Sequence, residues 1–263
     1  FNCFGLLDIT IIRHFLRWQR TYEPITDQWI GASSVFDALV SMATFRLNED
    51  EAQEATIIDS SGVSYKARSI YHPFLGEKAV RNNFDIQNHE YYIITGANMA
   101  GKSTFLRTLG VNYILAMNGL PVFAEEMRVS VFRLFTNMRT TDDLTHGISY
   151  FNAELLRLKQ LIASLDPNVP SLIILDEILK GTNSLDKLNG SRLFLEYISE
   201  RNVTGVIATH DLELSKLEDE NPQRFHNYSF EIELGTDVTY TYKIGRGVAR
   251  NQNATFLLKQ ILI

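Results

Sequence analysis

Cysteine is nearly missing from this sequence, since Cys3 is the only one among 263 residues. A single thiol cannot form an internal disulfide and offers no spacing for a metal site, which is consistent with a reducing compartment. No run reaches the roughly 18–20 apolar residues of a membrane span, and Asp8, Arg13 and His14 interrupt the most apolar stretch. We therefore expect a cytoplasmic protein, with a membrane anchor upstream of Phe1 left open.

An excess of basic charge is also missing, because 25 Lys and Arg residues face 31 Asp and Glu residues, giving a net charge of −6. This balance argues against the chain being, on its own, a strong DNA-binding surface. The chain begins at Phe1 and not at Met. We therefore expect a piece of a longer protein, in which DNA contact would come from other regions.

Hydrophobic periodicity divides the chain into two parts. Apolar positions at helical spacing predict helices over 6–20 and about 25–47, and an acidic linker follows at 48–51. Later segments alternate between predicted strands at 91–95, 171–175 and 204–208, predicted helices at 102–117, 149–165 and 187–200, and a hairpin over 228–242. We predict a helical lead-in over 1–50 and an α/β domain over 55–263, with a twisted, largely parallel sheet flanked by helices.

Residues 95–104 read Thr-Gly-Ala-Asn-Met-Ala-Gly-Lys-Ser-Thr and fit the phosphate-binding pattern G-x-x-x-x-G-K-[ST], between a predicted strand and a predicted helix. Backbone N–H groups of such a P-loop point at phosphate oxygens, and the helix N-terminus adds partial positive charge. Lys102 would reach the β- and γ-phosphates, and Ser103 would coordinate Mg²⁺. The pattern predicts ATP and Mg²⁺ as cofactors, with the nucleotide held by Gly96, Ala97, Asn98, Met99, Ala100, Gly101, Lys102, Ser103 and Thr104.

Two further apolar strands end in polar residues. The strand at 171–175 is followed by Asp176 and Glu177, and the strand at 204–208 by Thr209 and His210. Parallel strands deliver their C-terminal residues to the ligand crevice, so these side chains are expected beside the P-loop. Asp176 would hold Mg²⁺, Glu177 would activate the attacking water, and His210 would contact the γ-phosphate or the water.

Residues 147–154, Gly-Ile-Ser-Tyr-Phe-Asn-Ala-Glu, open a predicted helix, and Ser149 is a plausible N-cap. A helix start of this kind is also an anion site. The P-loop of the same chain already supplies a complete cradle. This raises the alternative that Ser149 contacts a phosphate on a second subunit.

Several of these motifs together resemble the ATPase domain of the MutS mismatch-repair family. The resemblance lies in Asn98-Met99 within the P-loop, the pattern Gly-x-Ser-x-Phe-x-x-Glu at 147–154, Asp-Glu-Ile followed by residues 181–184, and residues 208–214. It covers about residues 65–263. It implies an ABC-type P-loop NTPase that forms a homodimer, with Ser149 acting in trans and Asn183 and Asp186 facing the partner. It also implies that upstream domains bind double-stranded DNA, that Glu177, His210 and Asn98 are catalytic, and that no metal beyond Mg²⁺ is needed.

The chain departs from that family pattern in the P-loop and at the adenine site. Ala97 and Ala100 stand where the family has other residues, and both still leave room for phosphate. Ala79 occupies the position where the family often stacks an aromatic ring on adenine, and Tyr242 on the late hairpin is a candidate replacement. These departures indicate a divergent branch of the family.

Other nucleotide-dependent functions compete with this interpretation. A membrane-transporter subunit would carry Leu-Ser-Gly-Gly-Gln before its signature helix, whereas this chain has Thr-His-Gly-Ile-Ser at 145–149. A second alternative stays open. The chain could be a nucleotide-gated module that hydrolyses ATP too slowly to matter, in a complex outside repair, including a membrane-associated complex. The main hypothesis is an ATPase domain that couples nucleotide-dependent dimerisation to DNA binding or clamp movement.

Overall fold

The structure is a computed structural model that describes residues 6–138, 150–234 and 238–250. Two compact units divide the chain, Phe1–Asp50 and Glu51–Ile263.

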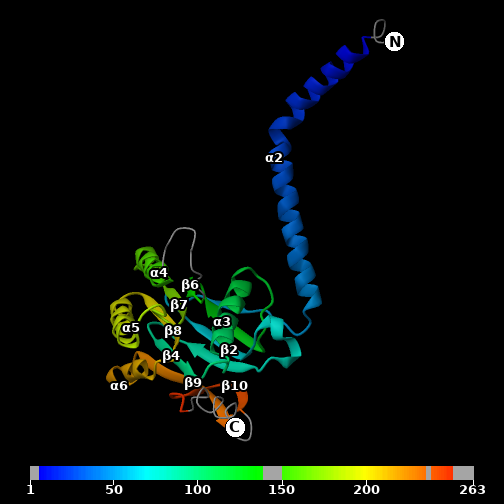
Figure 1. Cartoon of the computed structure of the whole chain (residues 1–263). Helices are drawn as coiled ribbons and strands as arrows, with labels where there is room; N and C mark the ends of the chain where they lie inside the picture. The colour runs from blue at the N-terminus through cyan, green and yellow to red at the C-terminus, as the bar shows by residue number, and fades with distance from the viewer. Residues whose placement is uncertain (1–5, 139–149, 235–237, 251–263) are drawn as a thin grey trace, which may run out of the picture. The chain divides into compact units, whose positions relative to one another are not determined.

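The first unit is one helix, α2 (Leu7–Asn48), where the sequence predicted two. Pro24 lies inside it. Proline removes one backbone hydrogen bond and commonly bends a helix, and α2 bends in its N-terminal half (Figure 1). Thr21 and Thr26 return hydrogen bonds to the carbonyls of Arg17 and Tyr22. The helix therefore continues through the predicted break, and the prediction of two helices is wrong.

Helix α2 has no buried residue within its own unit. One 18-residue window of it has a mean hydropathy of 1.2, so by length and composition alone it could cross a membrane. Scanning for unbroken apolar runs missed this window because small polar residues interrupt it. Core helices of soluble proteins have the same character, so the observation is weak evidence for a span.

The second unit is built on a six-stranded sheet in the order β10-β9-β4-β8-β7-β6. All neighbouring pairs are parallel except the hairpin of β9 and β10. Its strands are β4 (Tyr91–Gly96), β6 (Arg133–Asn137), β7 (Ser171–Asp176), β8 (Val203–Ala208), β9 (Phe225–Leu234) and β10 (Val238–Arg246). This confirms the predicted α/β class and a largely parallel sheet that holds both the 91–95 and 171–175 strands. Strand β6 was not predicted.

Helices cover both faces of this sheet because its strands are apolar on both sides. Ile94 of β4 packs in a core with α3 (Lys102–Met117), whereas Ile93 packs in a second core with α4 (Tyr150–Ser164) and α5 (Ser184–Ser199). This alternation follows from the two-residue period of a strand. The short helices η2 (Leu212–Lys216) and α6 (Leu217–Glu220) lead into β9.

A second sheet of four strands packs into the α3 core, in the order β1-β5-β2-β3. Its members are β1 (Thr56–Ile58), β2 (Tyr65–Ile70), β3 (Asn82–Ile86) and β5 (Glu126–Ser130), and η1 (Pro73–Lys78) joins β2 to β3. Strand β1 runs parallel to β5, whereas β2 is antiparallel to both of its neighbours. The sequence showed β-rich runs here but not a separate mixed sheet.

Candidate functional site

The turn between β4 and α3 has backbone geometry that only small residues accommodate well. Gly101 has φ +110°, in the left-handed region. A Cβ on Gly96 would lie 2.9 Å from the backbone oxygen of Phe230, which leaves no room for a side chain. Met99 also has positive φ, and its side chain is largely exposed. The glycine spacing of the predicted motif thus has a direct steric cause.

Lys102, the first residue of α3, is buried and folds back over this turn. Its Nζ donates hydrogen bonds to the carbonyl oxygens of Gly96 at 2.8 Å and Ala97 at 2.9 Å. Burial lowers the pKa of Lys102 to about 8, while the carboxylates of Asp176 and Glu177 act in the opposite direction. The ammonium group is therefore held at the mouth of the turn with two acids close by.

The start of α3 presents backbone donors to the same space. Its N-cap, Gly101, makes no side-chain capping bond, and the Phe105 N–H donates to the Gly101 carbonyl as the helix begins. The N–H groups that precede this bond have no partner within the helix. Together with the helix dipole they favour an anion at this point.

Strand register brings the predicted acidic pair beside this turn. Asp176 of β7 pairs with Ala208 of β8, and Ala208 pairs with Ile94 of β4. Asp176 is mostly buried, and the next residue, Glu177, adopts φ +63°. The carboxyl ends of three parallel strands therefore bring Asp176, Glu177 and His210 to the sheet edge where the turn lies.

Glu177 is held between two basic side chains. His210 Nε2 lies 3.4 Å from Glu177 Oε1, and Lys187 Nζ donates to Glu177 Oε2 at 3.4 Å. Burial, followed by the nearby charge of Lys102, lowers the pKa of His210, which favours the neutral imidazole. Sequence reasoning missed Lys187, because a lysine in the first turn of a helix carries no signal of its partner.

Glu154 of α4 anchors the segment that follows Glu177. Its carboxylate accepts hydrogen bonds from the backbone N–H groups of Leu179 at 2.7 Å and Lys180 at 2.9 Å. The side chain is buried, and burial raises its pKa against the effect of these two donors. The final glutamate of the 147–154 motif is thus a structural support for the segment that carries Glu177.

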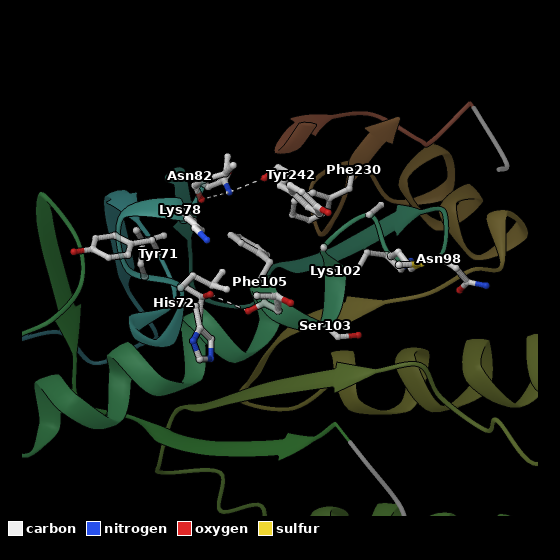
Figure 2. A pocket seen from close by; sticks show the side chains of 18 of the residues that line it. Tyr71, His72, Lys78, Asn82, Asn98, Lys102, Ser103, Phe105, Phe230 and Tyr242 are labelled. Carbon is white, nitrogen blue, oxygen red and sulfur yellow. Dashed lines mark hydrogen bonds between the residues drawn. The ribbon is translucent and has the colours of Figure 1, made fainter. Parts of the chain in front are cut away.

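A cavity of about 560 Å³ opens beside the turn. One end, which we call the loop end, is lined by Asn98 to Thr104, and His210 also lines the cavity. The other, which we call the hairpin end, is formed by Val80, Asn82 and Tyr242. Figure 2 shows Asn98, Lys102 and Ser103 toward one side and Lys78, Asn82 and Tyr71 toward the other. A cavity of this size can hold a small organic ligand.

The structure thus places most predicted site residues around one space. Asn98, Met99, Ala100, Gly101, Lys102, Ser103, Thr104, His210 and Tyr242 all line the cavity. Asn183 and Asp186 bond to each other at the start of α5. Ser149 lies outside the described residues.

Several residues that line the hairpin end were not predicted as site residues. Val80 and Asn82 lie ahead of the P-loop, within the range of about 65–263 that resembles the family, and Phe230 lies within the predicted hairpin. Val80 lines the cavity next to Ala79, the position considered for adenine. They could be recognised only by knowing that β3 contacts β10. The sequence carries no signal of this contact.

Metal-binding side chains are sparse around the cavity. Over residues 6–138, 150–234 and 238–250, no three His, Cys, Asp or Glu side chains converge as a metal cluster. Ser103 and Asp176 alone would give a cation two protein oxygens. A hard cation here would need its other oxygen ligands from phosphate and water, which is the usual arrangement for Mg²⁺.

The chain is similar to known proteins over most of its length. The profile of MutS domain V matches residues 92–256. Proteins called DNA mismatch repair protein MutS are similar to this chain: the one from Acetivibrio thermocellus is 32% identical over 82% of the chain, and that from Persephonella marina is 32% identical over 89%. The one from Clostridium botulinum strain Loch Maree is 31% identical over 91%. The chain spans only about a quarter of the length of these relatives, 25–27%.

Proposed function

This chain belongs to the MutS family, and from that premise we propose that it is an ABC-type P-loop ATPase domain that binds ATP with Mg²⁺ and hydrolyses it. The observation that carries the proposal is the turn from Gly96 to Gly101, with Lys102 buried over it and the start of α3 open toward the cavity. Backbone donors, a helix N-terminus and a lysine at one point form a binding site for phosphate groups.

The triphosphate would occupy the loop end of the cavity. Lys102 would exchange its two carbonyl partners for β- and γ-phosphate oxygens, whose negative charge attracts the ammonium group more strongly than a neutral carbonyl does. The Ser103 hydroxyl and the Asp176 carboxylate would hold Mg²⁺, which supplies charge neutralisation at the phosphates. Asn98, exposed at the rim of the loop end, would contact the γ-phosphate side.

Glu177 is the general base in this proposal. Its carboxylate would accept a proton from a water that attacks the γ-phosphorus, and the bond from the γ-phosphorus to the bridging oxygen breaks to give ADP and phosphate. His210 lies 3.4 Å from Glu177 and lines the cavity, so its neutral imidazole is well placed to orient the water. The base of the nucleotide would extend to the hairpin end, where Tyr242 offers an aromatic face.

The wider role follows from the relatives and is also a proposal. Proteins named for DNA mismatch repair share this domain, and we propose that nucleotide-dependent homodimerisation couples hydrolysis to double-stranded DNA held by other regions. Ser149 would act in trans on the partner's nucleotide. A nucleotide-gated module of a complex outside repair is the alternative, and it predicts binding without significant turnover.

The test is a steady-state ATPase assay with Glu177→Gln and, as a matched control, Glu200→Gln on the exposed end of α5. We expect Glu177→Gln to lower kcat about 100-fold with ATP binding retained, since an amide cannot accept the proton. The control variant should behave as the parent, and EDTA should abolish turnover. Parent-like turnover of Glu177→Gln contradicts the assignment of the base.

Light scattering of Glu177→Gln with and without ATP tests dimerisation in the same preparations. We expect a dimer only with ATP and a parental specific activity that rises with protein concentration. A protein that remains monomeric with ATP, yet hydrolyses it at a concentration-independent rate, contradicts the dimer.

A further inference from the structure

We propose that Asn82 is a positioning residue that holds Tyr242 against the hairpin end of the cavity and so sets how tightly the base of the nucleotide is bound. This inference rests on the proposed function, because it assigns a role toward the nucleotide base. It gives a residue of the second sheet a defined role toward a residue of the first.

Tyr242 sits at an irregularity of strand β10. Tyr240 pairs with Ile232 and Ile244 with Phe230, so three residues of β10 lie opposite Glu231 alone. Tyr242, in the middle of these three, adopts φ +53°. A non-glycine residue in this conformation is strained, and such strain persists only where surrounding contacts determine it.

Asn82 provides contacts on both sides of this irregularity. Its Nδ2 donates to the Tyr242 carbonyl at 3.1 Å and to the Val80 carbonyl at 3.3 Å, and its Oδ1 accepts from the Ile244 N–H at 3.0 Å. The side chain is only 7% exposed. One amide therefore fixes the backbone before and after Lys243, and Figure 2 draws its bond to Tyr242.

The consequence is a defined place for the Tyr242 ring. A Cβ on Gly101 would lie 3.1 Å from Tyr242 Cδ1, so the ring borders the turn of the loop end. Tyr240 stacks against it, with centroids 5.9 Å apart. The ring also lines the cavity and is 43% exposed, which leaves aromatic surface for a nucleotide base to stack on.

A role that is merely structural would predict a different result. Asn82 joins β3 to β10 and so links the two sheets, and its loss could weaken the fold as a whole. A general loosening would reduce the affinity for any ligand of the cavity. A positioning role reduces affinity only for ligands that carry a base, and only while Tyr242 is present.

The experiment measures dissociation constants of Mg²⁺–ATP and Mg²⁺–tripolyphosphate by calorimetry for Asn82→Ala, Tyr242→Ala and the double variant. Asp85→Ala, on the exposed face of β3, is the control. We expect Asn82→Ala to weaken ATP binding about tenfold, within the range measured for one base on one aromatic ring, and tripolyphosphate binding less than twofold. The double variant should be no weaker than Tyr242→Ala, because residues that act through one another are not additive.

Equal losses for ATP and tripolyphosphate, or full additivity in the double variant, overturn the inference. If Asn82→Ala does not fold, Asn82→Ser is measured by the same criteria. A parent protein that binds neither ligand refutes the proposed function instead. A parent that binds both equally well keeps the phosphate site and overturns the role of Asn82 and Tyr242.

Discussion

The loop end of the cavity comes from one continuous stretch of chain, whereas Asn82 and Tyr242 at the hairpin end are 160 residues apart. At the loop end, glycine geometry and a helix start fix the position of the backbone. At the hairpin end, one buried amide holds a strained aromatic residue in place. The geometry of a continuous motif is determined by its own residues, whereas the geometry of an assembled surface depends on the packing of the two sheets. We therefore expect substitutions at the two ends to have different effects on ligand binding.

The largest expected effect separates the ends most clearly. Lys102→Ala removes the only side-chain cation that reaches the Gly96 and Ala97 carbonyls in the described structure. We expect ATP and tripolyphosphate affinities to fall together, at least about 100-fold, or about 2.7 kcal/mol. Calorimetry checks this, with Lys159→Ala on the exposed face of α4 as the control. A loss of affinity for ATP alone would contradict the assignment of phosphate binding to the loop end.

A second variant tests whether the segment after Glu177 depends on a residue far from the P-loop in sequence. Glu154→Ala leaves the N–H groups of Leu179 and Lys180 without their acceptor, so we expect the free energy of unfolding to fall by about 2–3 kcal/mol. Glu154→Gln keeps one acceptor and should lose less. Urea denaturation measures both, and an unchanged stability of Glu154→Ala would show that these bonds contribute nothing.

The smallest expected effect lies where the ends meet. Gly101→Ala combines positive φ with a Cβ 3.1 Å from Tyr242, and we expect a loss of about 1–2 kcal/mol in stability and a greater loss of ATP than of tripolyphosphate affinity. Gly119→Ala is the control, because Gly119 has φ +68° and open space around its Cβ. It should lose stability through backbone strain and keep both affinities. Equal affinity changes in the two variants would mean that the contact with Tyr242 is unimportant.

Prediction from the sequence succeeded where a signal is local. The strands around Ile93 and Ile173 and the helix from Lys102 were read from short apolar runs and a glycine turn, and all three are confirmed. The α/β class followed from their alternation. Local signals sufficed because each of these elements is buried on both faces or specified by its own backbone.

The failures share a dependence on distant contacts. Strand β6 is short and lies at the sheet edge, and its apolar residues Leu134 and Phe135 are only partly buried, so the sequence marks it weakly. The second sheet depends on which β-rich runs pair with each other. The role of Asn82 depends on its hydrogen bonds to Tyr242 and Ile244, which are 160 and 162 residues away in the sequence. The break expected between residues 20 and 25 did not occur, and α2 runs through Pro24 as one helix.

Two kinds of contact fix the distance between α4 and the segment that follows Glu177. The two hydrogen bonds of Glu154 oppose separation. Approach is opposed by the close backbone of Phe151, because a Cβ on Gly181 would lie 3.0 Å from the Phe151 Cα. A connection that resists both pulling and pushing transmits displacement instead of absorbing it. A protein that displaces the start of α4 would therefore displace the segment after Glu177 as well. This displacement would not require a change in the bound nucleotide.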